Sequence, residues 1–498
     1  MSEAFDLFII GGGINGVGIA RDAAGRGLKV MLVEMDDLGS KTSSASSKLI
    51  HGGLRYLEHY EFRLVREALG ERETLLKIAP HIIWPLTFVL PHDRDIRPAW
   101  IIRAGLFLYD HLASRVTLPT SRQLDLSRAA EGEGLKSGVV TGFSYADCWV
   151  DDARLVVLNA VDAHERGAVI KTRTKFQSAK RVDNVWHIVT EKQDGTLEQH
   201  SAHMVVNAAG PWVREVMGQM SGVSRQARIR LVKGSHIVVP ALHQGKHAFI
   251  LQNPDKRIIF VIPYEGDYSL IGTTDISHQG DAGTACISQE ERLYLCESAS
   301  RFMARMITPA DILWEFAGVR PLFDDDDGAD ASKVTRDYVF DLQSDQGRAP
   351  ILNIYGGKIT TYRRLAEQAL DQLASWCKMP GTRWTGTSPL PGGDISGTFE
   401  SFAASLQRQY AYLPAALLHR YARAYGTRTH RLLQGIANIA SLGEHFGAGL
   451  YQREVDYLMH YEWAQSSDDI LWRRTKLGLH GGQDLASAVE AYLDHHRA

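Results

Sequence analysis

The stretch Phe5–Glu34, FDLFIIGGGINGVGIARDAAGRGLKVMLVE, decides how the rest of the chain is organised. It begins with a short apolar run that predicts a buried parallel strand. Gly11, Gly13 and Gly16 follow at G-x-G-x-x-G spacing and lead into apolar residues at helical spacing. A second apolar run then predicts another strand, which ends at Glu34. The order strand, glycine turn, helix and strand predicts a doubly wound, Rossmann-like α/β fold.

Each part of this unit has a physical role in holding a dinucleotide. The first glycine permits a tight turn, the second lets a pyrophosphate approach the backbone, and the third lets the helix pack against the strand. The free N–H groups and the positive dipole end of the helix face the phosphates. A carboxylate at Glu34 would accept hydrogen bonds from a ribose hydroxyl. An ordinary glycine-rich turn explains the glycines alone, but not the strand, helix and acid together.

Composition places the chain among ordinary globular proteins with two or three domains. It has 498 residues, 44% apolar and 23% charged. The net charge of -3 gives no basic field, so we expect no nucleic-acid partner. Four widely spaced cysteines predict reduced thiols and no zinc site. The unspaced run of acids at 324–327 predicts a solvated loop, not a metal site. No apolar run is long enough to span a bilayer, and the first residues do not fit a signal peptide.

Beyond the first unit, strand and helix patterns alternate. Residues 62–78 predict an amphipathic helix, and residues 85–180 predict short strands and loops. Alternating runs around 194–195 and around 265–267 predict two hairpins, and the second belongs to an antiparallel sheet that would cap the cofactor. The apolar run at 204–212 predicts a strand that returns to the nucleotide sheet.

The sequence changes character after residue 393, where helical patterns dominate. A second strand–glycine–helix junction at 351–376 comes before this point, and its helix N-terminus is another place to stabilise negative charge. The later helical patterns cover residues 399–410, 415–425, 430–440, 452–464, 470–476 and 484–495. We therefore expect a separate C-terminal helical domain.

Residues 97–112 mix aromatic, apolar and basic side chains, among them Trp100, Phe107 and Arg103. Amphipathic segments of this kind can lie in the plane of a membrane interface. A core helix with two exposed arginines explains the same pattern, and the sequence alone favours that interpretation.

The chain resembles the FAD-dependent glycerol-3-phosphate dehydrogenases of the aerobic, respiratory kind, and the match runs nearly end to end. The most specific stretch is the block TSSASSKLIHGGLRYLEHY at 42–60. The other matching stretches are 10–18, VVNAAGPW at 205–212, KGSHIV at 233–238, GTTD at 272–275, GVRPL at 318–322, TRDY at 335–338 and GGKITTYR at 356–363.

The resemblance implies three domains: a doubly wound FAD-binding domain, an inserted antiparallel-sheet substrate cap and an all-helical C-terminal domain. We expect the FAD-binding domain in three pieces, 1–80, 145–225 and 335–388. The cap is expected at 81–144 and 226–334, and the helical domain at 389–498.

The resemblance also implies FAD as the cofactor. The residues that match the family's FAD-binding positions are Gly11, Gly13, Asn15, Gly16, Glu34, Ser43, Ser44, Ser47, Ala209, Gly210, Gly357, Lys358 and Thr360. The helix that starts after Gly357 would stabilise negative charge on the reduced flavin.

The implied reaction is oxidation of sn-glycerol 3-phosphate to dihydroxyacetone phosphate, with the C2 hydride passing to flavin N5. Arginine forks suit a phosphate dianion, so we place Arg55 and Arg336 near the phosphate. Arg320 would polarise the developing C2 carbonyl. His236 or a Lys358 of depressed pKa would take the hydroxyl proton, and the choice between them stays open. Further expected substrate contacts are His51, Tyr56, Thr274 and Asp275.

The resemblance implies a quinone as electron acceptor, and a cytoplasmic protein attached peripherally to the inner face of the cytoplasmic membrane. It leaves a homodimer open. Three rivals remain: a glycerol-3-phosphate oxidase that uses oxygen and releases hydrogen peroxide, an amine- or amino-acid-oxidising enzyme of the same fold, and a flavin-binding protein without activity.

Overall fold

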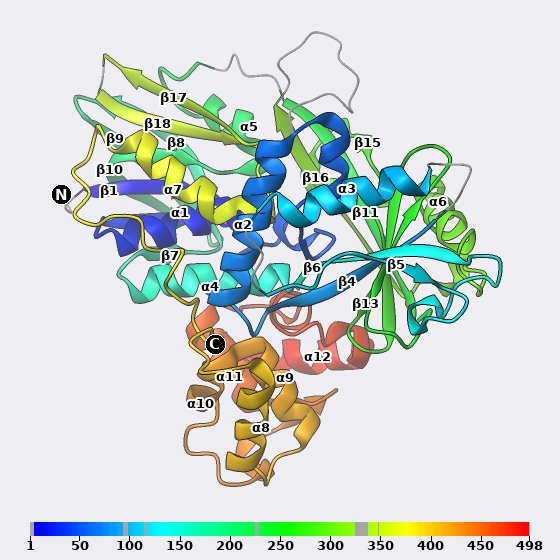
Figure 1. Ribbon diagram of the computed structural model, residues 1–498. Coiled ribbons are helices and arrows are strands. Elements are labelled where there is room, and N and C mark those ends of the chain that lie inside the picture. Colours follow the sequence, from blue (N-terminus) through cyan, green and yellow to red (C-terminus); the bar gives the residue numbers. More distant parts are fainter. Residues whose placement is uncertain are drawn as a thin grey trace.

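The computed structural model describes residues 4–92, 98–113, 117–224, 229–323, 337–346 and 348–497. Two large β-sheets stand side by side, and a group of helices lies beneath them (Figure 1). Each sheet is built from segments that are far apart in the sequence. The arrangement confirms the expected fold class, a doubly wound domain with a second, largely antiparallel sheet and a C-terminal helical region.

The nucleotide sheet starts with the unit that opens the chain, β1 (Phe5–Ile10), α1 (Ile14–Gly25) and β2 (Val30–Val33). Within the described residues its other strands are β7 (Val169–Lys171), β8 (Thr174–Val182), β9 (Val185–Lys192), β10 (Leu197–Asn207), β17 (Val339–Asp345) and β18 (Arg348–Tyr355). The pairs β7–β2, β2–β1, β1–β10 and β10–β18 are all parallel. The antiparallel pair β9–β10 confirms the first predicted hairpin, and β10 confirms the predicted return to this sheet.

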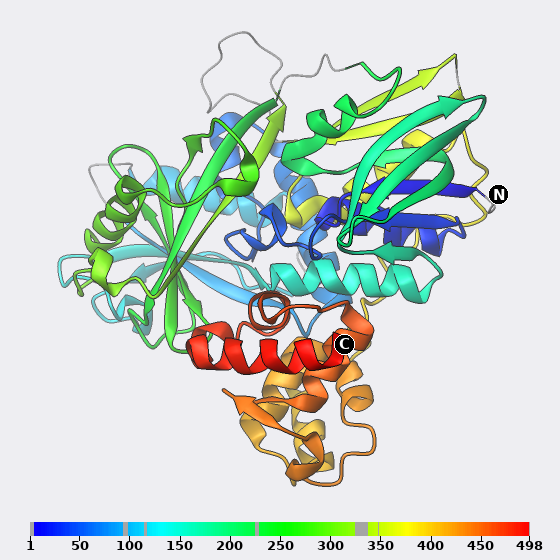
Figure 2. The same cartoon turned by 180° about the vertical axis from the view of Figure 1, so that it is seen from behind.

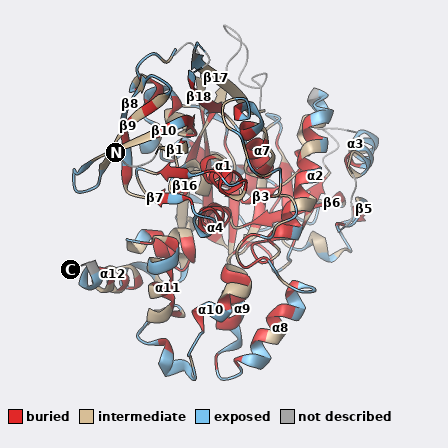
Figure 3. Ribbon diagram, turned by 90° about the vertical axis from the view of Figure 1, so that its left-hand side faces the viewer, coloured by how far each residue is buried: buried red, intermediate tan, exposed pale blue. Residues whose placement is uncertain are grey.

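Successive side chains of β1 enter two separate cores because a strand alternates its faces. Leu7 and Ile9 pack with α1, α4 (Asp152–Glu165) and α7 (Tyr362–Leu373). Phe8 and Ile10 pack on the other face, with side chains from β8, β9 and α5 (Val213–Gly218). Seen from the side, α1 and α4 are buried along most of their length (Figure 3).

Helix α4 corrects the expectation that residues 85–180 hold only strands and loops. Asp151 caps the helix by accepting a hydrogen bond from the backbone N–H of Arg154 at 3.1 Å. Residues 152–163 are buried on every side. A helix covered all round has no polar stripe, so the 3.6-residue period that marks a surface helix is missing from its sequence.

The second sheet is antiparallel except where β12 pairs with β4. Its members within the described residues are β3 (Leu49–Ile50), β4 (Ile83–Pro91), β5 (Arg122–Asp125), β6 (Thr141–Val150), β11 (Ile229–Pro240), β12 (Ala248–Gln252), β13 (Ile258–Tyr264), β14 (Tyr268–Gly272), β15 (Ile276–Ser277) and β16 (Trp314–Phe323). The β13–β14 pair confirms the second predicted hairpin. Helix α6 (Gln289–Ser300) packs on this sheet.

Helix α2 (Phe62–Ile78) has the predicted bounds, and α3 (Ala99–His111) lies near it (Figure 1). Helix α3 corrects the preferred interpretation of residues 97–112. Only Leu106 and Tyr109 of this helix are buried, whereas Trp100 is 72% exposed and Phe107 is 63% exposed. The amphipathic pattern does form a helix, but α3 turns most of its apolar face outward. Residue 97 lies outside the described residues.

The C-terminal region is mainly helical and has its own core around Leu406, Tyr421 and Leu458. Within the predicted helix at 430–440, only the first residues are helical, as part of α10 (Thr429–Leu432), and a turn and the 3-10 helix Ile439–Leu442 follow. The region also holds a small hairpin, β19 (His445–Gly447) with β20 (Leu450–Tyr451). Its helices are α8 (Phe399–Gln409), α9 (Ala415–Tyr425), α10 (Thr429–Leu432), α11 (Gln452–Glu462), the π-helical turn Asp469–Arg474 and α12 (Gly478–Arg497). In the described part of the chain, no helix is long and apolar enough to cross a membrane.

Candidate functional site

A cavity of about 880 Å³ lies where the ends of the parallel strands meet the second sheet. The β1–α1 turn and the loop after β2 form one wall. Residues 208–219, the 356–360 junction and strands β11, β13 and β16 line the rest. The crevice at the carboxyl ends of parallel strands is the usual ligand position in open α/β sheets.

The glycines of the first turn leave no room for side chains. Gly11 has φ of +108°, and a Cβ there would lie 2.7 Å from the carbonyl oxygen of Ala208. A Cβ on Gly16 would lie 1.9 Å from the carbonyl oxygen of Gly11. The backbone therefore comes close to the residues that follow β10 on one side and lines the cavity on the other, as a pyrophosphate needs.

Glu34 ties the end of β2 to the glycine turn. Its carboxylate accepts hydrogen bonds from the backbone N–H groups of Gly12 at 2.6 Å and Asp36 at 2.9 Å. Burial raises the pKa of Glu34, and these two hydrogen bonds oppose the rise. Each carboxylate oxygen has a second lone pair, so Glu34 can still accept from a ligand hydroxyl.

His236 lies on β11 within the cavity wall. Its Nε2 atom is 2.9 Å from the Ser47 hydroxyl, and its ring stacks on Phe316 with centroids 4.8 Å apart. Its Nδ1 atom has no hydrogen-bond partner among the described residues. Burial, together with the nearby cations Lys48 and Arg320, lowers the pKa of His236 to about 3. The imidazole is therefore neutral at physiological pH.

Cationic side chains line the same cavity. Arg320 Nη2 donates to Asp275 Oδ1 at 2.8 Å. Lys358 Nζ lies 4.0 Å from the centre of the Tyr56 ring, which gives a cation–π contact. Arg55 lies with Tyr56 in the 3-10 turn Leu54–His59 and also lines the cavity. A small anion bound here would meet several positive charges at once.

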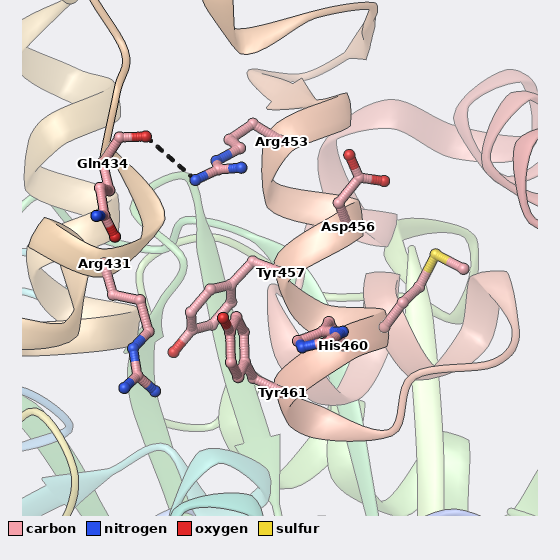
Figure 4. Close-up of a pocket in the computed structure, with 8 residues that line it drawn as sticks. Arg431, Gln434, Arg453, Asp456, Tyr457, His460 and Tyr461 are labelled. Atoms are coloured by element: carbon pink, nitrogen blue, oxygen red, sulfur yellow. Dashed lines mark hydrogen bonds between the residues drawn. The ribbon is translucent and has the colours of Figure 1, made fainter.

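A second hollow of about 520 Å³ lies on the C-terminal helices (Figure 4). Arg453 donates to the carbonyl oxygens of Leu432 at 2.8 Å and Gln434 at 3.2 Å. None of the predicted site residues lines this hollow. The cavity between the two sheets is therefore the candidate site.

Comparisons with known proteins agree with this geometry. Residues 6–363 match the family of FAD dependent oxidoreductases, and residues 384–496 match the C-terminal domain of alpha-glycerophosphate oxidase. The chain is 54% identical to a glycerol-3-phosphate dehydrogenase of Pseudomonas aeruginosa over 479 residues, which cover 96% of this chain and 93% of that one. The chain belongs to the FAD-dependent glycerol-3-phosphate dehydrogenase family.

Two further relatives of this dehydrogenase family inform the site. One is a D-erythritol 1-phosphate dehydrogenase of Brucella abortus, 53% identical over 494 residues, with 99% of this chain and 98% of that one covered. The other is the crystal structure of a glycerol-3-phosphate dehydrogenase from Bacillus halodurans complexed with FAD. That structure is 27% identical, has a TM-score of 0.79, and the match covers 99% of this chain and 91% of that one.

The residues present fit FAD, the cofactor of the family. The backbone at Gly11 and Gly13 lines the cavity and would receive the pyrophosphate, and Ser43 Oγ accepts from the N–H of Ile14 at 3.0 Å at the start of α1. Asn15 donates to the carbonyl oxygen of Gly356 at 3.1 Å, while its Oδ1 atom is buried without a partner among the described residues. A buried unpaired oxygen beside the cavity suits a hydrogen-bond donor on the ligand.

Most of the predicted site residues come together in this one cavity. Those that line it are Gly11, Gly13, Asn15, Glu34, Ser43, Ser47, His51, Arg55, Tyr56, Ala209, Gly210, His236, Thr274, Asp275, Arg320, Gly357, Lys358 and Thr360. Thr360 accepts a hydrogen bond from the backbone N–H of His51 at 3.3 Å, which joins two of the matched stretches. Burial lowers the pKa of His51.

Gly16 and Ser44 are not part of the cavity lining, and Thr274 lines it without a free hydroxyl. Gly16 is buried within α1, and the Ser44 hydroxyl faces the carbonyl oxygen of Lys41 at 3.4 Å. Thr274 is fully buried, and its hydroxyl donates to Glu291 at 2.7 Å, so it supports the wall without offering a free group. Arg336 lies outside the described residues.

The sequence interpretation missed Lys48 and the aromatic wall. Lys48 is 1% exposed, pairs with Asp152 at 2.8 Å and lies 5.3 Å from the centre of the Phe316 ring. A lysine inside the most specific matching stretch was the available signal. The wall residues Tyr145 and Phe260 belong to β6 and β13, and only the sheet pairing reveals that they face the site.

Proposed function

We propose that the protein oxidises sn-glycerol 3-phosphate to dihydroxyacetone phosphate and passes the electrons to a quinone. The observation that supports this proposal best is that one cavity contains both the dinucleotide cradle and the cluster formed by Arg55, Arg320, Lys358 and His236. Bound FAD supplies the hydride acceptor, so the residues of the chain need only hold the substrate, aim its C2–H bond and move one proton.

The cations divide into two tasks. Arg55 and Arg336 hold the phosphate dianion, for which the planar guanidinium provides paired N–H donors. Arg320 lies on β16 and is anchored by Asp275 at 2.8 Å, so its positive charge stays fixed where the C2 oxygen gains carbonyl character. Lys358, held over the Tyr56 ring, adds a point charge to the same region.

His236 takes the proton from the C2 hydroxyl. Its ring contacts the Ser47 hydroxyl of the cavity wall through Nε2 at 2.9 Å, whereas Nδ1 is buried and has no partner among the described residues. Its low pKa in the free protein makes it a weak base. A substrate phosphate would offset the charges of Lys48 and Arg320 and would thereby raise this pKa, which ties proton transfer to substrate binding.

Helix α3 supports the assignment of a membrane quinone as acceptor. Trp100, Phe107 and the neighbouring Tyr60, which is 80% exposed, present aromatic side chains together with the exposed Arg103. Aromatic and basic residues of this kind favour the membrane interface. Helix α3 packs on the turn that carries Arg55 and Tyr56, so this surface lies next to the substrate end of the cavity. We propose that this surface of α3 attaches the protein to the inner face of the cytoplasmic membrane.

A second candidate substrate is a four-carbon polyol phosphate. The 53% identity to a D-erythritol 1-phosphate dehydrogenase is nearly the same as the identity to a glycerol-3-phosphate dehydrogenase. The same phosphate cluster and the same base would serve both compounds, and only the space around the additional CH(OH) group would differ.

The test compares substrates and acceptors on the same flavoprotein. Under anaerobic conditions each polyol phosphate is mixed with the protein and the rate of flavin bleaching is recorded, and then either oxygen or a soluble quinone is added. We expect faster bleaching with glycerol 3-phosphate and faster recovery with quinone. Faster bleaching with D-erythritol 1-phosphate would show that this compound is the preferred substrate. Rapid recovery in oxygen with release of peroxide would show that oxygen is the acceptor.

A further inference from the structure

The loop that follows β2 is held from outside by the C-terminal part of the chain. Residues 34–35 and 39–41 of this loop line the FAD cavity. Asp37, between them, is outside the lining and is 1% exposed. The C-terminal segment runs beneath α4 on this side of the molecule (Figure 2).

Asp37 binds two consecutive arginines that lie 436 and 437 residues further along the chain. Arg474 donates to both carboxylate oxygens of Asp37, from Nη1 to Oδ2 at 2.5 Å and from Nη2 to Oδ1 at 2.8 Å. Arg473 adds Nε–Oδ2 at 2.5 Å. All three side chains are buried or nearly so. A two-armed arginine–carboxylate contact fixes orientation as well as distance.

A second buried acid anchors the other side of the loop. Asp469 receives Arg173 Nη2 at 2.7 Å and also binds Arg473. The backbone N–H of Arg173 donates to the carbonyl oxygen of Asp36 at 3.0 Å, and the next residue, Thr174, donates to that of Glu34 at 2.8 Å. The π-helical turn Asp469–Arg474 thus contacts both Asp37 and Arg173, which lies between β7 and β8 and hydrogen-bonds to the Glu34 loop.

Asp469 is charged at neutral pH. Burial raises the pKa of Asp469, but Arg474, the N–H of Gln465, Arg173 and Arg473 outweigh it and leave the pKa at about 2. Ion pairs of this depth hold their partners in one geometry, and removing one partner leaves the other charge buried and uncompensated.

We propose that the turn Asp469–Arg474 is a positioning element for the adenosine end of FAD. The network of Asp37, Arg173, Asp469, Arg473 and Arg474 holds the Glu34 loop in the conformation that receives the ribose, so the affinity for FAD depends on the docked C-terminal region. Preorganisation of this kind improves binding without new contacts to the ligand. The inference rests on FAD binding alone and is independent of the substrate and of the acceptor.

The first test measures FAD affinity in matched variants. Arg473→Gln removes contacts to Asp37 and Asp469, whereas Arg428→Gln removes an ion pair to Glu165 at 2.8 Å, at another point between the C-terminal region and α4. FAD is titrated into each apoprotein and followed by flavin fluorescence. We expect the dissociation constant to rise roughly tenfold for Arg473→Gln and to stay within twofold of wild type for Arg428→Gln. Equal constants in both variants would overturn the proposal.

Two further measurements keep the proposal testable if a variant folds poorly. Arg474→Lys keeps the charge but loses one arm, so it should bind FAD with an affinity between wild type and Arg474→Gln. In the wild-type protein, coupling is reciprocal, so FAD should slow amide hydrogen exchange in residues 465–475. Slower exchange confined to the cavity lining, with no change in 465–475, would refute the inference.

Discussion

At the scale of single residues, the site depends on buried polar groups whose charge state or hydrogen bonding is set by their surroundings. His236 is neutral because burial and nearby cations depress its pKa to about 3. Lys48 is buried with its charge paired to Asp152 at 2.8 Å and a hydrogen bond to the Ser44 carbonyl oxygen at 3.1 Å. Glu34 has both oxygens occupied by backbone N–H groups before any ligand arrives. His236 and Glu34 line the cavity, where a ligand would bring its own charge or hydroxyls.

Arg320→Ala should leave the yellow flavoprotein intact and slow flavin reduction by glycerol 3-phosphate at least about a hundredfold, because a fixed positive charge at the developing carbonyl is lost. Stopped-flow bleaching measures the rate. Arg257→Ala is the matched control, since that arginine also lines the cavity but lies over Tyr294 and pairs with Asp255. Near-normal reduction by Arg320→Ala would remove Arg320 from the site.

Glu34→Ala should weaken FAD binding about tenfold or more, since it removes a charged acceptor and leaves the N–H of Gly12 unpaired. Asp36→Ala is the control, because the Asp36 side chain pairs with Lys41 at 2.9 Å. Equilibrium dialysis of the flavin gives the affinity. Retention of flavin equal to that of wild type would argue against a contact between Glu34 and the ribose.

The pH dependence of flavin reduction tests the state of His236. The profile of the apparent second-order rate reports the free protein, where the depressed pKa keeps His236 neutral above pH 5. We therefore expect wild type and His236→Asn to show the same acid limb, set by the substrate phosphate, with a lower plateau for the variant. An additional limb near pH 6.5 in wild type alone would show that His236 titrates at its ordinary pKa.

At the scale of elements, the strong periodic patterns were the ones that sequence could predict. The first β-α-β unit, α2 and the two hairpins follow directly from spacing and turn residues. Helix α4 was missed because it is buried on all sides. The exposure of α3 was also missed, because an amphipathic sequence does not say whether its apolar face meets a core or the outside.

Helix α3 should control attachment to membranes. Replacing Trp100 and Phe107 together with alanine should reduce binding to vesicles that contain anionic lipids about tenfold or more, because each ring loses its burial in the interface. Sedimentation with vesicles gives the bound fraction. Leu197→Ala is the control, since that residue is 63% exposed on β10, far along the chain from α3. Unchanged sedimentation of the double variant would place the attachment surface elsewhere.

At the scale of the whole molecule, three regions meet around one cavity. The first sheet supplies the cradle, the second sheet supplies His236 and Arg320, and the C-terminal region holds the loop of Glu34 through Asp37. Sequence motifs identified the first two contributions. The third could not be predicted, because a contact between residues 37 and 474 leaves no local pattern in either segment.

The central claim is that FAD and a polyol phosphate share this cavity. The most direct measurement is an anaerobic titration of the purified flavoprotein with glycerol 3-phosphate, followed at the flavin absorption band. The account predicts complete bleaching that saturates with substrate and is prevented when inorganic phosphate competes at high concentration. Bleaching that is unchanged by a high concentration of inorganic phosphate, or a flavin that stays oxidised throughout, would contradict the claim of a shared cavity.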